Sequence, residues 1–223
     1  MIIPVLHRDD RLVLVDKPPG LVVHRGWADD DGGVLVALRD QLGQRVWPLH
    51  RLDRGASGVL AFALDHQTAS VVGQAFADGR VEKKYLALVR GRPPDHLIID
   101  HPIPAKPDGP RVPAVTEIRR LGTWERYALV EAVPRTGRLH QIRRHLKHIA
   151  CPLIGDVNYG KGEHNRIFRQ RFGLDRLALH ALSLRLPASD DGGAIHAFTV
   201  PSGTLADCLR ALDLLALVPT PGS

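Results

Sequence analysis

The sequence HRLDRGASG at residues 50–58 runs directly into the apolar sequence VLAFAL at residues 59–64. Six uninterrupted apolar residues predict a strand that is covered on both faces, because a half-exposed strand would alternate polar and apolar positions. The glycines and the serine before it are typical of a sharp turn. Arg51 and Arg54 flank Asp53, and two guanidinium groups favour the ionised carboxylate and attract a polyanion. The residues alone allow either an active-site loop that presents Asp53 or a solvated loop with a surface ion pair.

This stretch resembles the HRLDxxTSG signature of the RluA family of pseudouridine synthases, in which the Asp is the catalytic nucleophile. Ala56 stands where that family has Thr, which removes a hydroxyl group and leaves Asp53 in place. The matching residues are His50, Arg51, Leu52, Asp53, Ser57 and Gly58. A weaker resemblance is that of residues 53–57 to the DTGAS-type loop of aspartic proteases, because Arg54 replaces a small hydroxyl residue.

A second informative stretch is basic and covers residues 135–149. Leu139, Ile142, Leu146 and Ile149 recur on one face of a helix, so this stripe is expected to pack inward. The remaining positions carry more positive charge than a stable helix needs, and an anionic partner should compensate it. His145 and His148 lie at metal-ligand spacing, but no third ligand accompanies them.

Residues 137–146 resemble the GRxHQLRxHL motif of the same family. The resemblance implies that Arg143 pairs with the catalytic Asp. Residues 83–87 are similar to the KxYxA motif, which implies that Tyr85 lies against the flipped base and removes a proton. Three shorter likenesses are NKPxGxxVH from position 16, with Asp16 in place of Asn, HPIxGD from position 151, with Cys151 in place of His, and LxLHA at residues 177–181.

The likeness spans about residues 10 to 200 and implies a fold, a reaction and a set of contacts. The implied fold class is α+β, with a mixed, mainly antiparallel sheet flanked by helices and loops. We expect one catalytic domain over residues 1–223, with its core at about 10–217 and no S4 RNA-binding domain. Asp53 would attack C1′ of the ribose or C6 of uracil, and no metal or other cofactor is required. The residues expected to contact the substrate RNA are His50, Arg51, Lys83, Lys84, Arg138, His140, Gln141, Arg144 and Lys147.

Several features are nearest to the tRNA-modifying branch of the family, which implies uridine 65 of tRNA as the target. They are His24-Arg25-Gly26-Trp27, Gly155-Asp156 followed by Gly160, Asn165-Arg166 and residues 172–177. The alternative is a 23S rRNA substrate. Two remote alternatives are a non-catalytic RNA-binding protein, which gives Asp53, Tyr85 and Arg143 no joint role, and an aspartic protease, which needs a second Asp loop.

Composition agrees with an enzyme that binds RNA. The chain has 223 residues, a net charge of +6 and a pI of about 9.7, so an acidic partner is plausible. No run of ~18 apolar residues is present, and we expect a cytoplasmic monomer without a signal peptide. Cys151 and Cys208 are expected to be buried reduced thiols. The acidic run Asp29-Asp30-Asp31 lacks further ligands at calcium-loop spacing, which favours a solvated loop.

Hydrophobic periodicity predicts the remaining elements. Helices are expected at residues 34–42, 66–78, 139–149 and 204–217, and strands at residues 11–16, 59–64, 80–91, 114–120 and 127–133. The proline-rich residues 92–113 are expected to be irregular.

Overall fold

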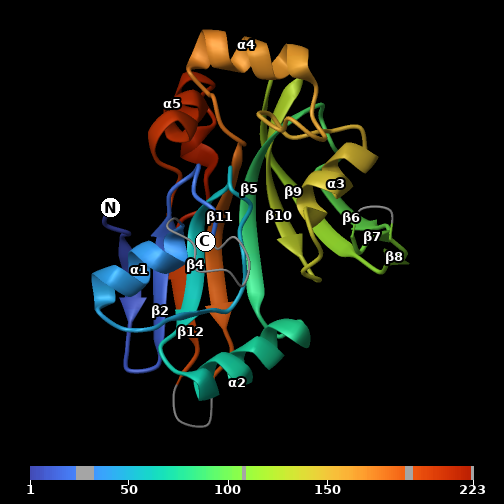
Figure 1. Ribbon diagram of the computed structural model, residues 1–223. Helices are drawn as coiled ribbons and strands as arrows, with labels where there is room; N and C mark the ends of the chain where they lie inside the picture. The colour runs from blue at the N-terminus through green and yellow to red at the C-terminus, as the bar shows by residue number, and fades with distance from the viewer. Residues whose placement is uncertain (24–32, 107–108, 189–192, 222–223) are drawn as a thin grey trace. The chain divides into compact units, whose positions relative to one another are not determined.

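A computed structural model describes residues 1–23, 33–106, 109–188 and 193–221. The chain divides into two compact units (Figure 1). Unit 1 comprises Met1–Lys83 and Ala181–Thr199, and unit 2 comprises Lys84–His180 and Val200–Ser223. Each unit is built on antiparallel strand pairs.

In unit 1 the strands follow the order β1-β2-β4-β11, with β3 paired to β4 and β12 paired to β11. Their bounds are β1 (Val5–Arg8), β2 (Leu12–Lys17), β3 (Trp47–Pro48), β4 (Ser57–Ala63), β11 (Leu179–Leu186, which begins in unit 2) and β12 (Ile195–Phe198). All seven residues of β4 are buried, as the uninterrupted apolar run predicts. The strand therefore forms the centre of this unit.

The helices of unit 1 are α1 (Val34–Leu42) and α2 (His66–Ala77), close to the predicted bounds. Asp65 begins α2, because its carboxylate accepts the Thr68 N–H at 2.8 Å. Ala75, Val72 and Phe76 pack against a core that includes Val59 and Leu184. The apolar pattern of this helix predicts that Val71 also points inward, but it is 58% exposed. Its neighbours at i+1, i+4 and i+5 already form the buried stripe.

In unit 2 the strands follow the order β5-β10-β9-β6, and β7 and β8 form a separate ribbon. Their bounds are β5 (Glu82–Arg90, which begins in unit 1), β6 (His96–Asp100), β7 (Ile103–Pro104), β8 (Arg111–Val112), β9 (Val115–Trp124) and β10 (Tyr127–Pro134). The helices are α3 (Gln141–His148), α4 (Gly162–Phe172), α5 (Gly203–Ala211) and the 3₁₀ turn η1 (Leu215–Leu217). Figure 1 shows α4 and α5 packed together at one end of the unit.

Three boundaries in unit 2 differ from the sequence-based expectation. Residues 92–113 are not wholly irregular, because β6 pairs with β9 along five positions, and this strand buries only Ile99. Helix α3 begins at Gln141 because His140 has a left-handed backbone conformation with φ 53°. The last helix ends at Ala211, since Asp213 has φ 56° and cannot continue it.

The predicted α+β class with a mainly antiparallel sheet is confirmed. Cys151 and Cys208 are free and buried, as expected. Burial raises the pKa of the Cys208 thiol to about 12. Within the described ranges, no helix is long and apolar enough to cross a membrane. The expectation of a single catalytic domain stays a prediction.

Candidate active site

Asp53 lies in the loop that enters β4 in unit 1. Leu52 and Ala56 on either side are buried, whereas Asp53 is half-buried. The Ala56 N–H donates to the Asp53 carbonyl at 3.0 Å and closes the turn. Gly58 has φ 107°, and a Cβ there would lie 2.2 Å from the carbonyl oxygen of Ala181. The glycine therefore lets β4 start where Asp53 is presented.

Lys17 binds the Asp53 loop through a backbone carbonyl, a contact that the sequence did not indicate. Its side chain is fully buried, and Nζ donates to the carbonyls of Pro18 and Leu21, both at 2.8 Å, and of Arg54 at 3.4 Å. Arg54 Nε donates in turn to the Gly20 carbonyl at 2.9 Å. The Pro-Pro-Gly turn after β2 is thus tied to the loop that carries Asp53.

His50 is engaged inside unit 1. Its Nε2 accepts the Ala61 N–H at 3.1 Å, and its ring stacks on Phe76 with centroids 4.9 Å apart. Burial, with a smaller effect from the positive charge of Lys83, lowers the pKa of His50 to about 3. The ring is therefore neutral at physiological pH, and its predicted contact with RNA stays a prediction.

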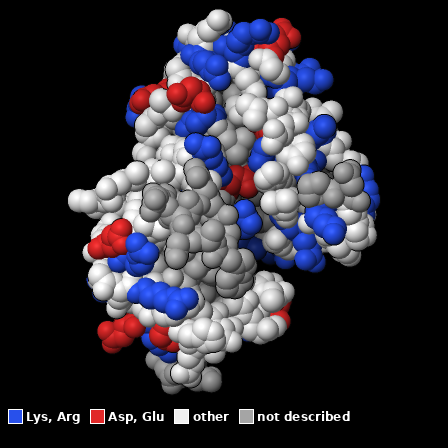
Figure 2. Space-filling view, viewed as in Figure 1, with Lys and Arg blue, Asp and Glu red and all other residues white. Residues whose placement is uncertain are grey.

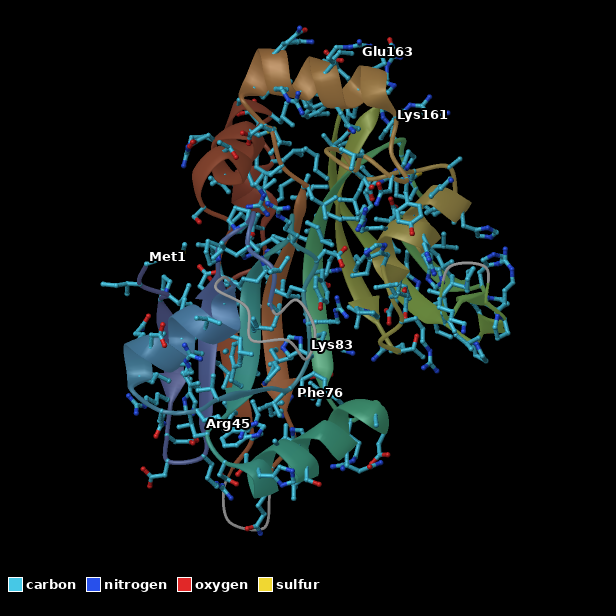
Figure 3. The ribbon with its side chains drawn as sticks, viewed as in Figure 1. Met1, Arg45, Phe76, Lys83, Lys161 and Glu163 are labelled. Atoms are coloured by element: carbon cyan, nitrogen blue, oxygen red, sulfur yellow. The ribbon has the colours of Figure 1, made fainter. Side chains whose placement is uncertain are left out.

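Lys83 is only 8% exposed, and burial lowers the pKa of its ammonium group. Figure 3 labels it at the start of β5, together with Phe76. The phosphate contact expected of Lys83 stays a prediction. Arg51 is exposed, which leaves it accessible to a substrate. Lys84, which begins unit 2, is half-buried.

In unit 2, α3 buries Arg143 as well as its apolar stripe. Arg143 Nε donates to Oδ2 of Asp156 at 2.7 Å, and Nη2 donates to Oδ1 at 2.9 Å. The side chains of Arg143 and Asp156 are 8% and 0% exposed. Burial alone would raise the pKa of Asp156, but the bonds from Arg143 and from the backbone N–H groups of Tyr159 and Asn158 outweigh it, and the pKa is lowered. The pair is a bidentate, charge-assisted interaction.

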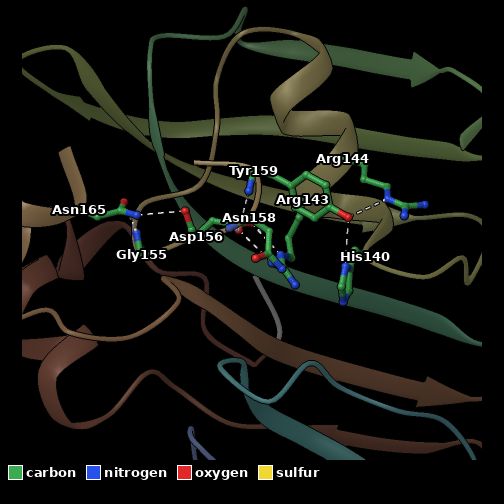
Figure 4. Close-up of polar contacts among 8 residues, drawn as sticks. All are labelled: His140, Arg143, Arg144, Gly155, Asp156, Asn158, Tyr159 and Asn165. Atoms are coloured by element: carbon green, nitrogen blue, oxygen red, sulfur yellow. Dashed lines mark hydrogen bonds and ion pairs between the residues drawn. The ribbon is translucent and has the colours of Figure 1, made fainter. Parts of the chain in front are cut away.

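Tyr159 covers this pair (Figure 4). The Arg143 guanidinium lies 5.0 Å from the ring centroid, within cation–π range. The hydroxyl oxygen of Tyr159 accepts a hydrogen bond from Arg144 Nε at 3.0 Å and lies 3.2 Å from Nδ1 of His140. Asn165 fixes the same loop, because its Nδ2 donates to the Asp156 carbonyl at 3.0 Å. One loop thus positions Arg143 from two sides.

Gln141 is also committed to the interior. Its Oε1 accepts from the Thr136 hydroxyl at 2.6 Å and from the Arg138 N–H at 3.0 Å. Its Nε2 donates to the Val115 carbonyl and to the Thr116 hydroxyl, both at 2.9 Å. All four hydrogen-bonding positions of the amide are used, which is the full capacity of this side chain.

The sequence of the chain is similar to those of known proteins over most of its length. Residues 11–148 match the RNA pseudouridylate synthase family. The chain belongs to that family. It is 44% identical over 204 residues to tRNA pseudouridine synthase C of Vibrio cholerae, covering 81% of this chain and 84% of that protein. The same enzyme of Salmonella typhimurium is 41% identical, with 82% and 79% covered. Human RNA pseudouridylate synthase domain containing 4 has a similar structure, with a TM-score of 0.77, 28% identity, and 94% and 93% covered.

Membership confirms the predicted pseudouridine synthase fold and the predicted enzyme class, an isomerase that forms pseudouridine in RNA. The residues assigned to catalysis fall in both units: Asp53 in unit 1, and Tyr85 and Arg143 in unit 2. Tyr85 lies on β5 opposite Ala132 and is 9% exposed. The pairing of Arg143 with Asp53 stays a prediction.

The RNA contacts expected in a pseudouridine synthase differ in accessibility. Arg138 and Lys147 are exposed, and Arg144 and His140 are half-buried. The segment His24–Trp27 and the acidic run from Asp29 lie outside the described residues. Within the described ranges, no three His, Cys, Asp or Glu side chains come together as a metal site.

Proposed function

We propose that the protein converts uridine 65 of tRNA to pseudouridine, acting as a cytoplasmic monomer. The observation that carries the choice of tRNA is the 44% identity, over most of both chains, to a protein named tRNA pseudouridine synthase C. The position of the uridine rests on the likeness to the tRNA-modifying branch of the family. The exposed basic side chains of α3 and its N-terminal approach agree with an RNA substrate.

In this proposal Asp53 is the nucleophile. Its carboxylate attacks C1′ of the ribose, the N1–C1′ bond breaks, and uracil leaves with the electron pair. Uracil then turns and forms the C5–C1′ bond, which displaces the Asp53 carboxylate, and the C5 proton is removed while N1 takes up a proton. Attack at C6 of uracil is the alternative route. Either route is an isomerisation, so atoms balance without a further reactant.

Arg143 and Tyr85 support this step in different ways. Arg143 keeps Asp53 ionised and oriented, and the bidentate bonds to Asp156 restrict its guanidinium to one orientation. Tyr85 lies against the base and takes the proton. Arg51 fills the space that the flipped nucleotide leaves in the RNA. Arg138, Arg144 and Lys147 bind phosphates, and His140 contacts the RNA beside them.

The test is tritium release from RNA labelled at C5 of uridine, because C5 loses its hydrogen in the reaction. Wild-type protein, Asp53→Asn and the control Asp40→Asn are incubated with tRNA and, separately, with 23S rRNA. Asp40 is a suitable control, since it is an exposed carboxylate paired with Arg39 on α1. We expect release from tRNA with the wild type and the control and none with Asp53→Asn.

Mapping the modified nucleotide by primer extension then tests the position. Release from rRNA alone would keep the reaction and overturn the substrate. Release by Asp53→Asn at the wild-type rate would overturn the nucleophile. No release from either RNA would overturn the proposed activity on both substrates.

A further inference from the structure

A group of arginines surrounds an open hollow in unit 2 that the reaction does not use. Gly91, Arg92, Glu125 and Arg126 line the hollow, whose volume is about 550 Å³. They come from the residues after β5 and from the turn between β9 and β10. Arg126 and Arg92 are exposed. We call this feature the arginine hollow.

Two further arginines lie beside it. Arg90 ends β5, and Arg171 lies in the last turn of α4. Both act electrostatically on Tyr127, as Arg126 does, which places their charges around one point. Burial lowers the pKa of His164 on α4, and Arg90 and Arg126 lower it further, so this ring stays neutral. Glu125 and Glu163 add negative charge at the same place, and the four arginines leave the surroundings of the hollow with a net positive charge.

These four arginines have no carboxylate partner among the described residues, a property that they share with Arg111, Arg138 and Arg144 of the same unit, and they lie beside one hollow. Arg92 Nε donates to a carbonyl, that of Glu125, at 2.6 Å. The Glu125 carboxylate lines the hollow but forms no ion pair within the described ranges. Elsewhere in the unit, carboxylates pair with arginines, as in Arg119–Glu131, Arg120–Asp95, Arg135–Glu117 and Arg143–Asp156. Uncompensated guanidinium groups in one place favour an anion from outside the chain.

Aromatic rings hold one of these guanidinium groups in place. Arg171 lies 5.6 Å from the ring centroid of Trp124 and 5.2 Å from that of Phe172. Trp124 in turn stacks on Tyr127 with centroids 5.8 Å apart. Stacking on aromatic rings uses the face of a guanidinium and leaves its N–H groups for hydrogen bonds such as those to phosphate.

We propose that the arginine hollow binds phosphate groups of the substrate RNA, as a contact separate from the residues assigned to the reaction. The proposal rests on the proposed function, which supplies an RNA. Planar guanidinium groups bind phosphate oxygens through two parallel hydrogen bonds. Figure 2 shows Lys and Arg side chains at α4 with acidic side chains beside them. The exposed Arg166 and Arg169 of α4 and Lys161, just before the helix, extend the positive surface.

The experiment measures, by fluorescence anisotropy, the affinity for an unmodified tRNA transcript at salt concentrations from about 0.05 to about 1 M NaCl. The variants are Arg92→Ala, Arg126→Ala and the double substitution. Arg210→Ala is the matched control, because Arg210 is an exposed arginine of the same unit whose one ion pair among the described residues is with Asp207 on its own helix. Circular dichroism confirms that each variant is folded.

Each substitution in the hollow should lower the slope of log affinity against log salt by about 0.7 to 0.9, the value for one phosphate contact. If variant and wild type bind equally at 1 M salt, a slope lower by about 0.8 means that the variant binds tRNA roughly sixfold more weakly than the wild type at 0.1 M salt. The double variant should lose about twice that slope. If both single variants bind tRNA with the slope and affinity of Arg210→Ala, the proposal is overturned.

A small phosphate compound is the other possible occupant, and titration with UMP and with inorganic phosphate tests it. The proposal would be overturned by two results together. The wild type would bind one of these compounds to saturation below about 1 mM and the variants Arg92→Ala and Arg126→Ala would not, while both variants kept the wild-type affinity for tRNA. Pseudouridine formation separates the two proposals. If the wild type modifies tRNA but the hollow variants bind as the control does, only this inference fails. If binding depends on the hollow but no pseudouridine forms, only the proposed function fails.

Discussion

Replacing Asp156 by Asn tests how Arg143 is held. The side chain keeps its shape, but it loses its charge and one of the two oxygens that face Arg143. The remaining oxygen can still accept the N–H groups of Asn158 and Tyr159, which bond to Oδ1 in the native protein. The substitution therefore leaves the backbone of the loop supported and removes the counter-charge of Arg143.

The magnitude follows from the burial of both partners. Removing one partner of a buried ion pair costs about 3–5 kcal/mol, because the other charge stays buried and unpaired. Since the loop keeps its backbone bonds, we expect Asp156→Asn to lower the free energy of unfolding by about 3 kcal/mol. Turnover should fall by about 100-fold, the effect of misplacing a catalytic group by roughly 1 Å.

Urea unfolding and single-turnover pseudouridine formation measure the two effects. The double variant Arg143→Gln with Asp156→Asn separates them, because two neutral amides leave no buried charge. It should recover most of the stability and none of the activity. Asp156→Asn with stability within about 0.5 kcal/mol of wild type and turnover within about threefold would refute the reasoning.

Three further predictions concern unit 1. Gly58→Ala should lower the free energy of unfolding by at least about 3 kcal/mol, because Gly58 has a φ of 107° and a backbone oxygen lies close to the added Cβ. Gly73→Ala should raise the free energy of unfolding by about 0.5 to 1 kcal/mol, because Gly73 lies on α2 with open space around it. Equal shifts of the melting temperature in the two variants would contradict this. The pKa of His50 is about 3 in the folded state, and its ordinary value is 6.5. The free energy of unfolding therefore carries the full contribution of neutral His50 above pH 6.5, and this contribution falls by up to about 1.4 kcal/mol per pH unit toward pH 3. His50→Gln should flatten that dependence in urea unfolding between about pH 5 and 6.5, and an unchanged dependence would argue against a neutral buried ring. Lys17→Met should leave three carbonyls without their donor and lower the free energy of unfolding by about 3 kcal/mol. Hydrogen exchange of the Gly20 N–H, which bonds to the Arg54 carbonyl, should become faster, and an exchange rate equal to that of the wild type would contradict the role of Lys17.

The sequence predicts an element well where burial leaves a distinct pattern. Strand β4 is buried on both faces, so its residues form one apolar run and its position is evident. Strand β6 pairs at an edge and buries only Ile99, so its pattern resembles that of a loop. Val71 shows the same limit on a helix, because an apolar residue next to a buried stripe carries no mark that it is exposed.

Buried charges were the part that sequence reasoning missed. The excess positive charge of α3 did indicate an anionic partner, and the expected partner was RNA. Part of that charge is compensated inside the chain by Asp156, thirteen positions after Arg143. No periodicity links two residues whose contact depends on how a loop folds back. Lys17 and Lys83 were missed for a related reason, since a lysine at a strand end is usually solvated.

The motif residues divide according to where their polar atoms are engaged. Gln141 uses its whole amide inside unit 2, and His50 uses Nε2 to hold the backbone of β4. Arg138 and Lys147, from the same kind of motif, are exposed. A match to a family motif therefore predicts that a residue has a role in the site. It does not predict whether the residue contacts the substrate or supports the structure around it. Burial and hydrogen bonding show which of these side chains are already engaged inside the chain, and the RNA contact expected of Gln141 stays a prediction.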